Sequence, residues 1–210
     1  INGIYYPISL RWRQCRHSFV FVKIRNQQTI CIISTEGTQA SSLIRSLAFH
    51  TNHRLLLMSD NSQWLQDLIT EIRAARESAP VEIIQCMVDG SWEADIIILD
   101  IPHEQIAANQ EKLAIVTNQK IIIHFSQPDT PSDINPGFNT MPTYNLTNWF
   151  PFSSLVRVFI GSLASIVESD DREAATTVLQ ILEDAGLNPF ESEKYSQGQL
   201  NSFNTTSQKQ

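Results

Sequence analysis

The sequence predicts an α/β protein in which a mostly parallel sheet is covered by helices on both faces. Three observations lead to this prediction. Short apolar runs rich in β-branched residues alternate with segments whose apolar residues recur at helical spacing, as expected for strands joined by crossover helices. A loop that contains Gly37 directly follows the first apolar run, and an acid, Asp60, follows the second.

The first predicted unit is a strand, a loop, a helix and a second strand. Residues 28–34 form an apolar, β-branched run typical of a buried parallel strand. After the loop at 35–39, apolar or small residues recur at the spacing of a helix that covers a sheet, at Ala40, Leu43, Ile44, Leu47 and Ala48. Residues 53–58 supply the second strand, and Asn61 or Ser62 can cap the next helix. The predicted buried residues of that helix are Trp64, Leu65, Leu68, Ile69 and Ile72.

The same alternation continues to residue 125 and then changes. The next predicted elements are strands at 81–86, 94–101 and 120–125, and a shorter helix at 103–113. Residues 127–152 carry five prolines and are predicted to form a long, irregular connection. A strand is predicted at 156–160. Asp170 or Asp171 is expected to cap the last helix, and Gly186 to end it in a left-handed conformation.

This pattern divides the chain into three parts. Residues 1–28 form a basic N-terminal extension with five basic residues and no acid. Residues 29–190 form the predicted domain, and residues 191–210 are a polar tail that we expect to be disordered. The net charge is −7, so the chain beyond the extension carries −12. An acidic body of this kind argues against a nucleic-acid partner, which needs clustered positive charge.

Composition restricts the setting of the protein. No apolar run approaches the roughly 18–20 residues of a membrane helix, so no membrane span is expected. The N-terminal residues do not resemble a cleaved signal peptide. Three widely spaced cysteines, two of them (Cys31 and Cys86) in strand-like apolar runs, predict reduced thiols and a cytoplasmic location. His50 and His53 have no evident third ligand, so no metal site is predicted.

The loop after the first strand is a partly degraded GxGxxG phosphate loop, which makes the predicted fold Rossmann-type and doubly wound. With the strand ending at Ser34, the three glycine places fall on Thr35, Gly37 and Ala40. Gly37 is kept and alanine is accepted at the third place, but the Cβ of Thr35 crowds the turn. Glu36 adds a negative charge, which would cost about 1 kcal/mol beside a diphosphate. Because the helix N-terminus still offers amides, binding is predicted to be weakened rather than excluded.

Asp60 occupies the place where dinucleotide-binding folds carry an acid. It lies at the end of the second predicted strand, 23 residues after Gly37. An acid there hydrogen-bonds the adenosine ribose and repels a 2′-phosphate, which favours NAD over NADP. Asp60 fits equally well as a turn or cap residue beside Asn61.

Several segments, in this order, carry a resemblance to a known family. They are TEGTQASSL after the first strand, ADIIILDIPHEQI at 94–106, KIIIHFSQP at 120–128, GFNTMPTYNL at 137–146, and VRVFIGS followed by ESDDREAATTVLQILEDAGLNPF at 168–190. Residues 29–190 thereby resemble the coenzyme-dependent NADP oxidoreductase family. That family includes reductases that exchange hydride between NADP and a deazaflavin, and the oxidoreductase domain of six-transmembrane metalloreductases.

The resemblance implies a set of site residues. The pyrophosphate would lie against Thr35, Gly37, Thr38, Gln39 and Ala40. The adenosine ribose would lie against Ser59, Asp60 and Asn61. Ile101, Pro102, His103 and Ser126 would line the cofactor cleft, and Phe138, Asn139 and Thr140 would lie near the nicotinamide and the second substrate.

This chain departs from the family at two places. NADP-using members tend to carry a basic or small polar residue where this chain has Asp60. Members commonly continue beyond the final helix with further helices that form the substrate site or a dimer, where this chain has its polar tail. A homodimer remains compatible with the resemblance.

Some residues have a plain structural explanation beside a functional one. His103 can meet a substrate or can be a solvent-facing residue at a helix start. Trp92, Trp149 and Phe150, which are predicted to lie in connections, can cover a ligand or anchor a loop.

Two functions follow from the sequence. The first is an NAD(P)-dependent oxidoreductase that passes hydride to a flavin-like or other small acceptor of unknown identity. Such chemistry needs aligned cofactors more than an acid–base pair, so the sequence leaves the catalytic residues unknown. The second is a degenerate Rossmann-fold protein without redox activity that serves as a ligand-binding or protein-interaction module. Thr35, Glu36 and the polar tail in place of further helices favour the second, whereas Gly37, Ala40, Asp60 and the GFNT stretch at 137–140 favour the first.

Overall fold

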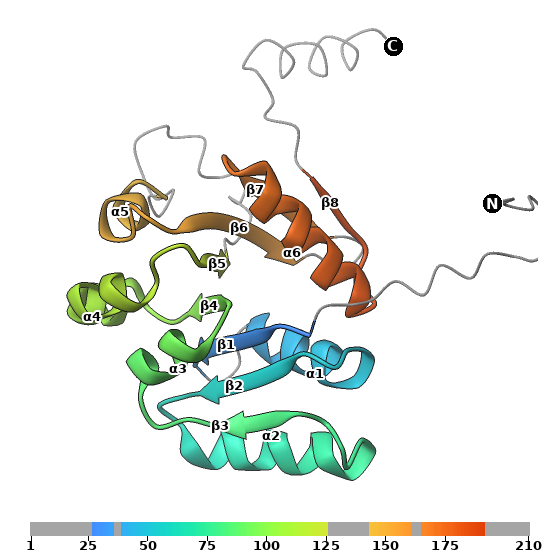
Figure 1. Ribbon diagram of the computed structural model, residues 1–210. Helices are drawn as coiled ribbons and strands as arrows, with labels where there is room; N and C mark the ends of the chain where they lie inside the picture. The colour runs from blue at the N-terminus through green and yellow to red at the C-terminus, as the bar shows by residue number, and fades with distance from the viewer. Residues whose placement is uncertain (1–26, 36–38, 126–142, 161–164, 192–210) are drawn as a thin grey trace, which may run out of the picture.

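Eight strands form one sheet in the order β3-β2-β1-β4-β5-β6-β7-β8 in the computed structural model, which describes residues 27–35, 39–125, 143–160 and 165–191 (Figure 1). The strands are β1 (Thr29–Ser34), β2 (Arg54–Met58), β3 (Val81–Ile83), β4 (Ile96–Asp100), β5 (Ile121–Phe125), β6 (Ser154–Ile160), β7 (Ser165–Ser169) and β8 (Pro189–Glu191). The helices are α1 (Gln39–His50), α2 (Ser62–Ala75), α3 (Met87–Glu93), α4 (His103–Val116), α5 (Thr143–Trp149) and α6 (Arg172–Asp184).

The sheet has the strand order of a doubly wound dinucleotide-binding fold. Strands β1 to β6 are parallel and lie in the order 3-2-1-4-5-6, with the reversal of winding between β1 and β4. Only the last part of the described sheet runs the other way, because β7 pairs antiparallel with β6 and β8 pairs parallel with β7. The predicted Rossmann-type, mostly parallel α/β fold is therefore confirmed.

Helices cover both faces of the sheet because the central strands are apolar on both sides. On β1, Ile30 and Ile32 belong to the core under α1, α2 and α6, whereas Cys31 and Ile33 belong to the core under α3, α4 and α5. In Figure 1, α4 and α5 lie on the left of the sheet, and α1 and α6 lie on the right. The five residues predicted to bury one side of α1 are the five that the structure buries: Ala40, Leu43, Ile44, Leu47 and Ala48.

Local signals at the helix ends act as the sequence predicts. The side chain of Asn61 accepts a hydrogen bond from the backbone N–H of Trp64 and so caps α2, and Asp171 caps α6 through Glu173 and Ala174. Gly186 has φ +79°, and its N–H donates to Glu183 while the N–H of Leu187 donates to Leu182. These two bonds close the last turn of α6 in the manner of a Schellman motif.

The structure corrects the sequence analysis at several elements. Residues 127–152 are not irregular throughout, because the part that is described contains α5. The strand predicted at 81–86 ends at Ile83, and Cys86 directly precedes the unpredicted helix α3 instead of lying in a strand. Strands β7 and β8 were not predicted either.

Helix α3 was missed because its reason lies outside its own sequence. A Cβ built at Gly90 would come within 2.1 Å of Ile84 Cδ1 and 3.0 Å of Cys31 Sγ. The glycine therefore lets α3 pack closely against β1, a contact that no local pattern reveals. Cys31 is fully buried in this contact, as predicted for a small apolar residue, and burial raises the pKa of its thiol to about 12.

Other expectations fall on residues that the structure does not describe. These are most of the basic extension, all but one residue of the polar tail, and the first part of the proline-rich connection. Among the described residues, no helix is both long enough and apolar enough to cross a membrane.

Candidate functional site

The candidate site lies at the edge of the sheet where β1, β2 and β4 end. Thr35, Asp60, Asn61, Ser62 and Gln63 line an open cavity of about 540 Å³ there. The first of these follows β1, and the other four follow β2 and begin α2. In open α/β folds, ligands bind outside the carboxyl ends of the strands at the reversal of strand order. The cavity occupies that place beside β1.

Asp60 lines the cavity and does not cap α2. Its side chain is exposed, and Ser59 Oγ lies 3.3 Å from one of its carboxylate oxygens. Asn61 supplies the cap of α2 instead, with its Oδ1 accepting from the backbone N–H of Trp64 at 3.0 Å. Ser59 Oγ in turn accepts from the N–H of Asn61 at 3.2 Å and stabilises the turn. Because Asn61 caps the helix, the Asp60 carboxylate makes no capping bond and is exposed at the cavity.

The start of α1 is occupied by a side chain that the sequence analysis did not single out. Oδ2 of Asp100 accepts a hydrogen bond from the backbone N–H of Ala40 at 2.9 Å. Asp100 is the last residue of β4 and pairs in register with Ser34, the last residue of β1. Its carbonyl oxygen also accepts from the N–H of Thr35 at 3.3 Å. The carboxylate therefore reaches across from β4 to the helix end at which a diphosphate would bind.

Buried oxygens without partners surround the same helix start. Ser34 Oγ, Gln39 Oε1 and Ser41 Oγ make no hydrogen bond with any residue that the structure describes. Ser34 is 1% exposed, so its hydroxyl is covered in the free protein. Buried polar atoms nearly always have partners, so these exceptions need an explanation such as an ordered water or a bound ligand; Ser91 and Thr117, away from this edge, are further exceptions.

Pro102 and His103 follow β4 but do not line the cavity. Pro102 precedes α4, and His103 begins it. The His103 ring stacks on Trp149 of α5, with the ring centroids 4.5 Å apart and an angle of 29° between the planes. His103 is thus half-buried between two helices instead of facing solvent, and Trp149 anchors α5 to α4. Phe150 is buried in the same core, whereas Trp92, at the end of α3, is exposed.

His124 is a second buried polar residue near this edge, and the sequence analysis missed it within an isoleucine run. It is the penultimate residue of β5 and is 9% exposed, and its Nε2 has no hydrogen-bond partner among the described residues. Burial lowers the pKa of its imidazole to about 4, with a smaller contribution from the nearby Arg157 guanidinium. The ring is therefore neutral at pH 7.

Ile101 follows β4, is half-buried and packs against the core under α3, α4 and α5, outside the cavity lining. The other predicted site residues lie outside the described residues. These are Gly37, Thr38, Ser126, Phe138, Asn139 and Thr140. The structure thus brings Thr35, Asp60 and Asn61 together at one cavity, holds Ala40 against Asp100, and leaves Pro102 and His103 outside the cavity lining. The signal that could have identified Asp100 is an acid that ends a run of buried apolar residues directly beside the phosphate loop.

Comparisons with solved structures extend these observations. No protein-family model and no curated protein sequence matches the chain. A protein from Arthrobacter sp. FB24, assigned as an F420-dependent NADP reductase, matches with a TM-score of 0.59 and 17% identity over 78% of this chain and 84% of that one. A pyrroline-5-carboxylate reductase from Coxiella burnetii matches with a TM-score of 0.58 and 16% identity over 82% and 61% of the two chains.

A protein from Bacteroides fragilis, assigned as an NADP oxidoreductase, matches with a TM-score of 0.59 and 10% identity over 86% of this chain and 65% of that one. This chain therefore spans less than two thirds of the length of the Coxiella burnetii and Bacteroides fragilis proteins. Identities this low establish a shared fold and no more. The chain has the Rossmann-type fold that NAD(P)-dependent oxidoreductases use.

Proposed function

We propose that this protein binds a nicotinamide dinucleotide at the carboxyl ends of β1 and β2, with NAD preferred over NADP. One observation carries the proposal: a single cavity joins Thr35, at the start of the phosphate loop, to Asp60, at the end of β2. This pairs the pyrophosphate position with the ribose position. The five lining residues include no lysine or arginine that would receive a 2′-phosphate.

The cofactor would contact residues from both sides of the cavity. Thr35, Gly37, Thr38, Gln39 and Ala40 would meet the pyrophosphate, and Ser59, Asp60 and Asn61 would meet the adenosine ribose. The free oxygens of Gln39 and Ser41 lie at the helix start, where ligand hydroxyls or bridging waters would satisfy them. The dinucleotide would carry the hydride chemistry, and the protein would orient it toward a flavin-like or small acceptor. The structure neighbours assigned as NADP oxidoreductases favour this class of reaction.

A second function has its own observation in its favour. Because Asp100 already accepts the Ala40 N–H, the chain can be a Rossmann-fold protein without redox activity that binds another ligand or a protein. Under this alternative, millimolar NADH or NADPH would neither raise the melting temperature nor change the tryptophan fluorescence.

The experiment that tests the proposal is titration of the full chain with NADH and NADPH, followed by calorimetry and thermal shift. We expect NADH to bind more tightly than NADPH, and Asp60→Asn to weaken NADH binding by about tenfold, because a ribose hydroxyl would lose a charged acceptor. Asp89→Asn, which makes the same charge change on an exposed residue of α3, is the matched control and should bind as the wild type does. If the wild type bound NADH and NADPH with equal affinity, and Asp60→Asn bound them as the wild type does, the cofactor site would not include Asp60.

A further inference from the structure

We infer that Asp100 is a specificity-determining residue that acts as an internal anion at the start of α1 and lowers the affinity of the site for phosphate groups. This inference rests on the proposed nucleotide site. It goes further by naming the residue that decides which class of ligand the site holds tightly. Asp100 would have little effect on the affinity for adenine nucleosides. It would strongly lower the affinity for nucleotides that carry a diphosphate.

The geometry of the helix start carries the argument. Ala40 is the second residue of α1, so its N–H is one of the amides that have no partner within the helix. In dinucleotide-binding folds those amides receive the pyrophosphate. Here the N–H of Ala40 donates to Asp100 Oδ2 at 2.9 Å. A single N–H cannot donate fully to a carboxylate and a phosphate at once, so a phosphate must displace Asp100 or accept a poorer contact.

The charge of Asp100 acts in the same direction. The first turn of α1 contains no acid of its own, and Asp100 supplies the negative charge that favours a helix N-terminus. No lysine or arginine among the described residues pairs with Asp100. An arriving diphosphate would therefore meet, within a few ångströms of its own charge, a carboxylate that no cationic side chain among the described residues neutralises.

The position of Asp100 in the sheet makes this arrangement stable. Asp100 is in register with Ser34, and its carbonyl accepts from the Thr35 N–H, so its backbone is held at the end of β1. Ser34 Oγ, buried and without a partner among the described residues, lies at the same level of the sheet. Asp100 does not pair with this hydroxyl, so a polar ligand atom or an ordered water can still be received beside it.

A ligand pair separates the role in phosphate binding from a merely structural role. Adenosine and ADP share the adenine and ribose that would meet Asp60, and they differ in the phosphates that would meet the start of α1. Asp100→Asn keeps the size of the side chain and a hydrogen-bond acceptor for the Ala40 N–H but removes the charge. Asp89→Asn is the matched control for the loss of one negative charge.

We expect Asp100→Asn to bind ADP and NADH about tenfold more tightly than the wild type, as loss of one like-charge contact predicts, while its affinity for adenosine changes less than twofold. Asp89→Asn should leave all three affinities unchanged. Calorimetry gives the affinities. As a second measurement, pyrophosphate should raise the melting temperature of Asp100→Asn more than that of the wild type.

The outcomes separate this inference from the proposed function. If the wild type binds NADH and Asp100→Asn binds it no more tightly, the inference is overturned and the proposed function stands. If only Asp100→Asn binds NADH, the inference stands and the wild type is not a dinucleotide-binding protein. Equal gains for adenosine and ADP would overturn the inference, because Asp100 would then act through the fold. Failure of every variant to bind ADP or pyrophosphate would overturn it as well.

Discussion

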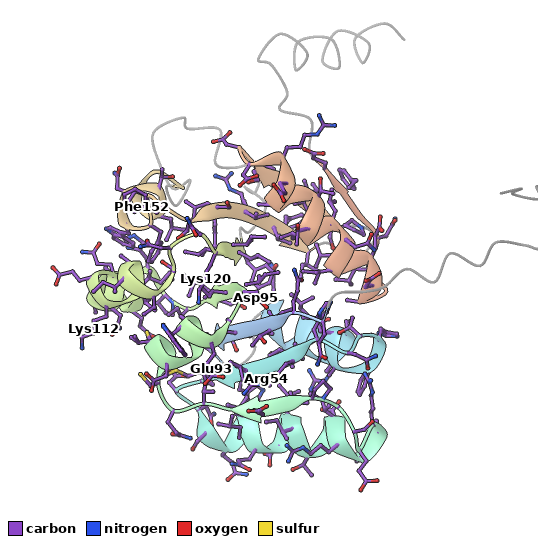
Figure 2. The ribbon with its side chains drawn as sticks, in the orientation of Figure 1. Arg54, Glu93, Asp95, Lys112, Lys120 and Phe152 are labelled. Carbon is purple, nitrogen blue, oxygen red and sulfur yellow. The ribbon has the colours of Figure 1, made fainter. Side chains whose placement is uncertain are left out.

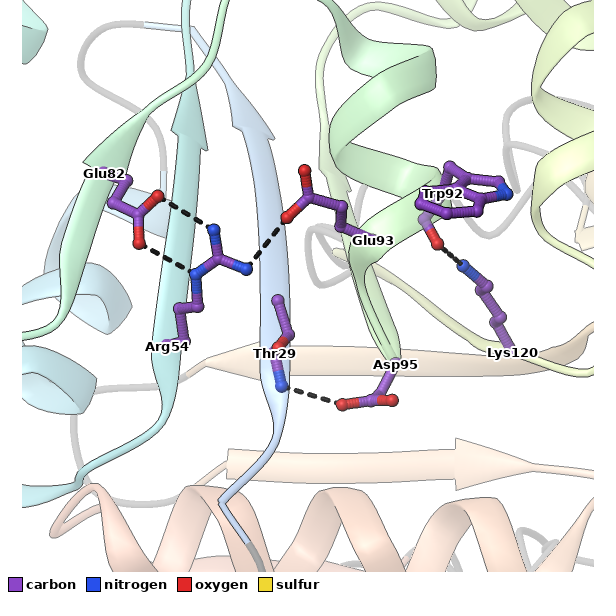
Figure 3. A network of polar contacts seen from close by, with 7 residues as sticks. All are labelled: Thr29, Arg54, Glu82, Trp92, Glu93, Asp95 and Lys120. Atoms are coloured by element: carbon purple, nitrogen blue, oxygen red, sulfur yellow. Dashed lines mark hydrogen bonds and ion pairs between the residues drawn. The ribbon is translucent and has the colours of Figure 1, made fainter.

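The acidic residues at the two edges of the sheet differ in whether they pair with a basic side chain. At the amino edge, where the strands begin, Arg54 on β2 forms two hydrogen bonds with Glu82 on β3 and an ion pair of 2.8 Å with Glu93 on α3 (Figure 3). At the carboxyl edge, where the strands end, neither Asp60 nor Asp100 is paired with a lysine or arginine among the described residues.

Hydrogen bonds between side chains and backbone groups link other strand starts at the amino edge. Asp95 accepts from the backbone N–H of Thr29 at 2.8 Å, and Lys120 donates to the carbonyl oxygens of Ser91 and Trp92 at 2.6 Å (Figure 3). In Figure 2, Arg54, Glu93, Asp95 and Lys120 follow one another across the strand starts. The comparison indicates where a ligand would bind: at the amino edge Glu82 and Glu93 are paired with Arg54, whereas at the reversal of strand order Asp60 and Asp100 have no cationic partner among the described residues.

The largest effect that we predict is a pH dependence of stability that comes from His124 at the carboxyl edge. Its folded-state pKa of about 4 lies below the ordinary value of 6.5, so the unfolded chain binds more protons between these two values. The contribution of His124 to stability is therefore present above pH 6.5 and is lost as the pH falls toward 4. The full loss amounts to about 3 kcal/mol. Chemical denaturation across this pH range should show that His124→Leu loses less stability on acidification than the wild type.

His50→Gln is the control for His124, because His50 is exposed at the end of α1. It should retain the pH dependence of the wild type. An equally steep loss of stability in His124→Leu and the wild type would show that this histidine is not held neutral by burial.

The second prediction concerns Ser34, whose replacement should increase the stability of the protein. Replacing a buried hydroxyl that lacks a partner removes the penalty of its desolvation, so Ser34→Ala should raise the free energy of unfolding by about 1 kcal/mol. If the hydroxyl contacts a bound nucleotide, the same variant should weaken NADH binding by about fivefold. Thermal denaturation and calorimetry check the two effects.

Thr117 offers a matched control at the other edge of the sheet. Its Oγ1 is also buried without a hydrogen-bond partner among the described residues, and it lies just before β5. Thr117→Val should raise stability in the same way but leave NADH affinity unchanged. A loss of stability in Ser34→Ala would contradict the view that this hydroxyl is unsatisfied in the free protein.

The smallest effect tests the amino edge. Arg54→Met removes an exposed set of ion pairs, which should lower the free energy of unfolding by less than about 1 kcal/mol, and by less still in 1 M salt. NADH affinity should not change. If Arg54→Met bound NADH more weakly than the wild type, the amino edge would also contribute to ligand binding, contrary to the comparison above.

The sequence predicted the parts of this molecule that depend on local order. The stripe from Ala40 to Ala48, the Asn61 cap and the left-handed Gly186 all follow from spacing or from one residue type, and the structure agrees with each. Helix α3 and strands β7 and β8 were missed because they are short and depend on tertiary packing.

The candidate site was predictable only in part for a similar reason. The position of Asp60 follows from its place after a strand. The role of Asp100 depends on the pairing of β4 with β1, which brings a residue 60 positions away to the start of α1. Whether the site takes NAD, NADP or neither stays a prediction, because it depends on charges in a loop of which Glu36 and Gly37 lie outside the described residues.

The two outer strands of the described sheet have a consequence for the protein at high concentration. β3 and β8 are each three residues long, β3 carries the charged Glu82, and β8 begins with Pro189, which has no N–H to donate. Short, charged or proline-bearing outer strands offer little unpaired backbone to the outer strand of another molecule. The described sheet is therefore protected against growth into intermolecular β-aggregates, which suits the protein to the concentrated samples that calorimetry of weak ligands requires.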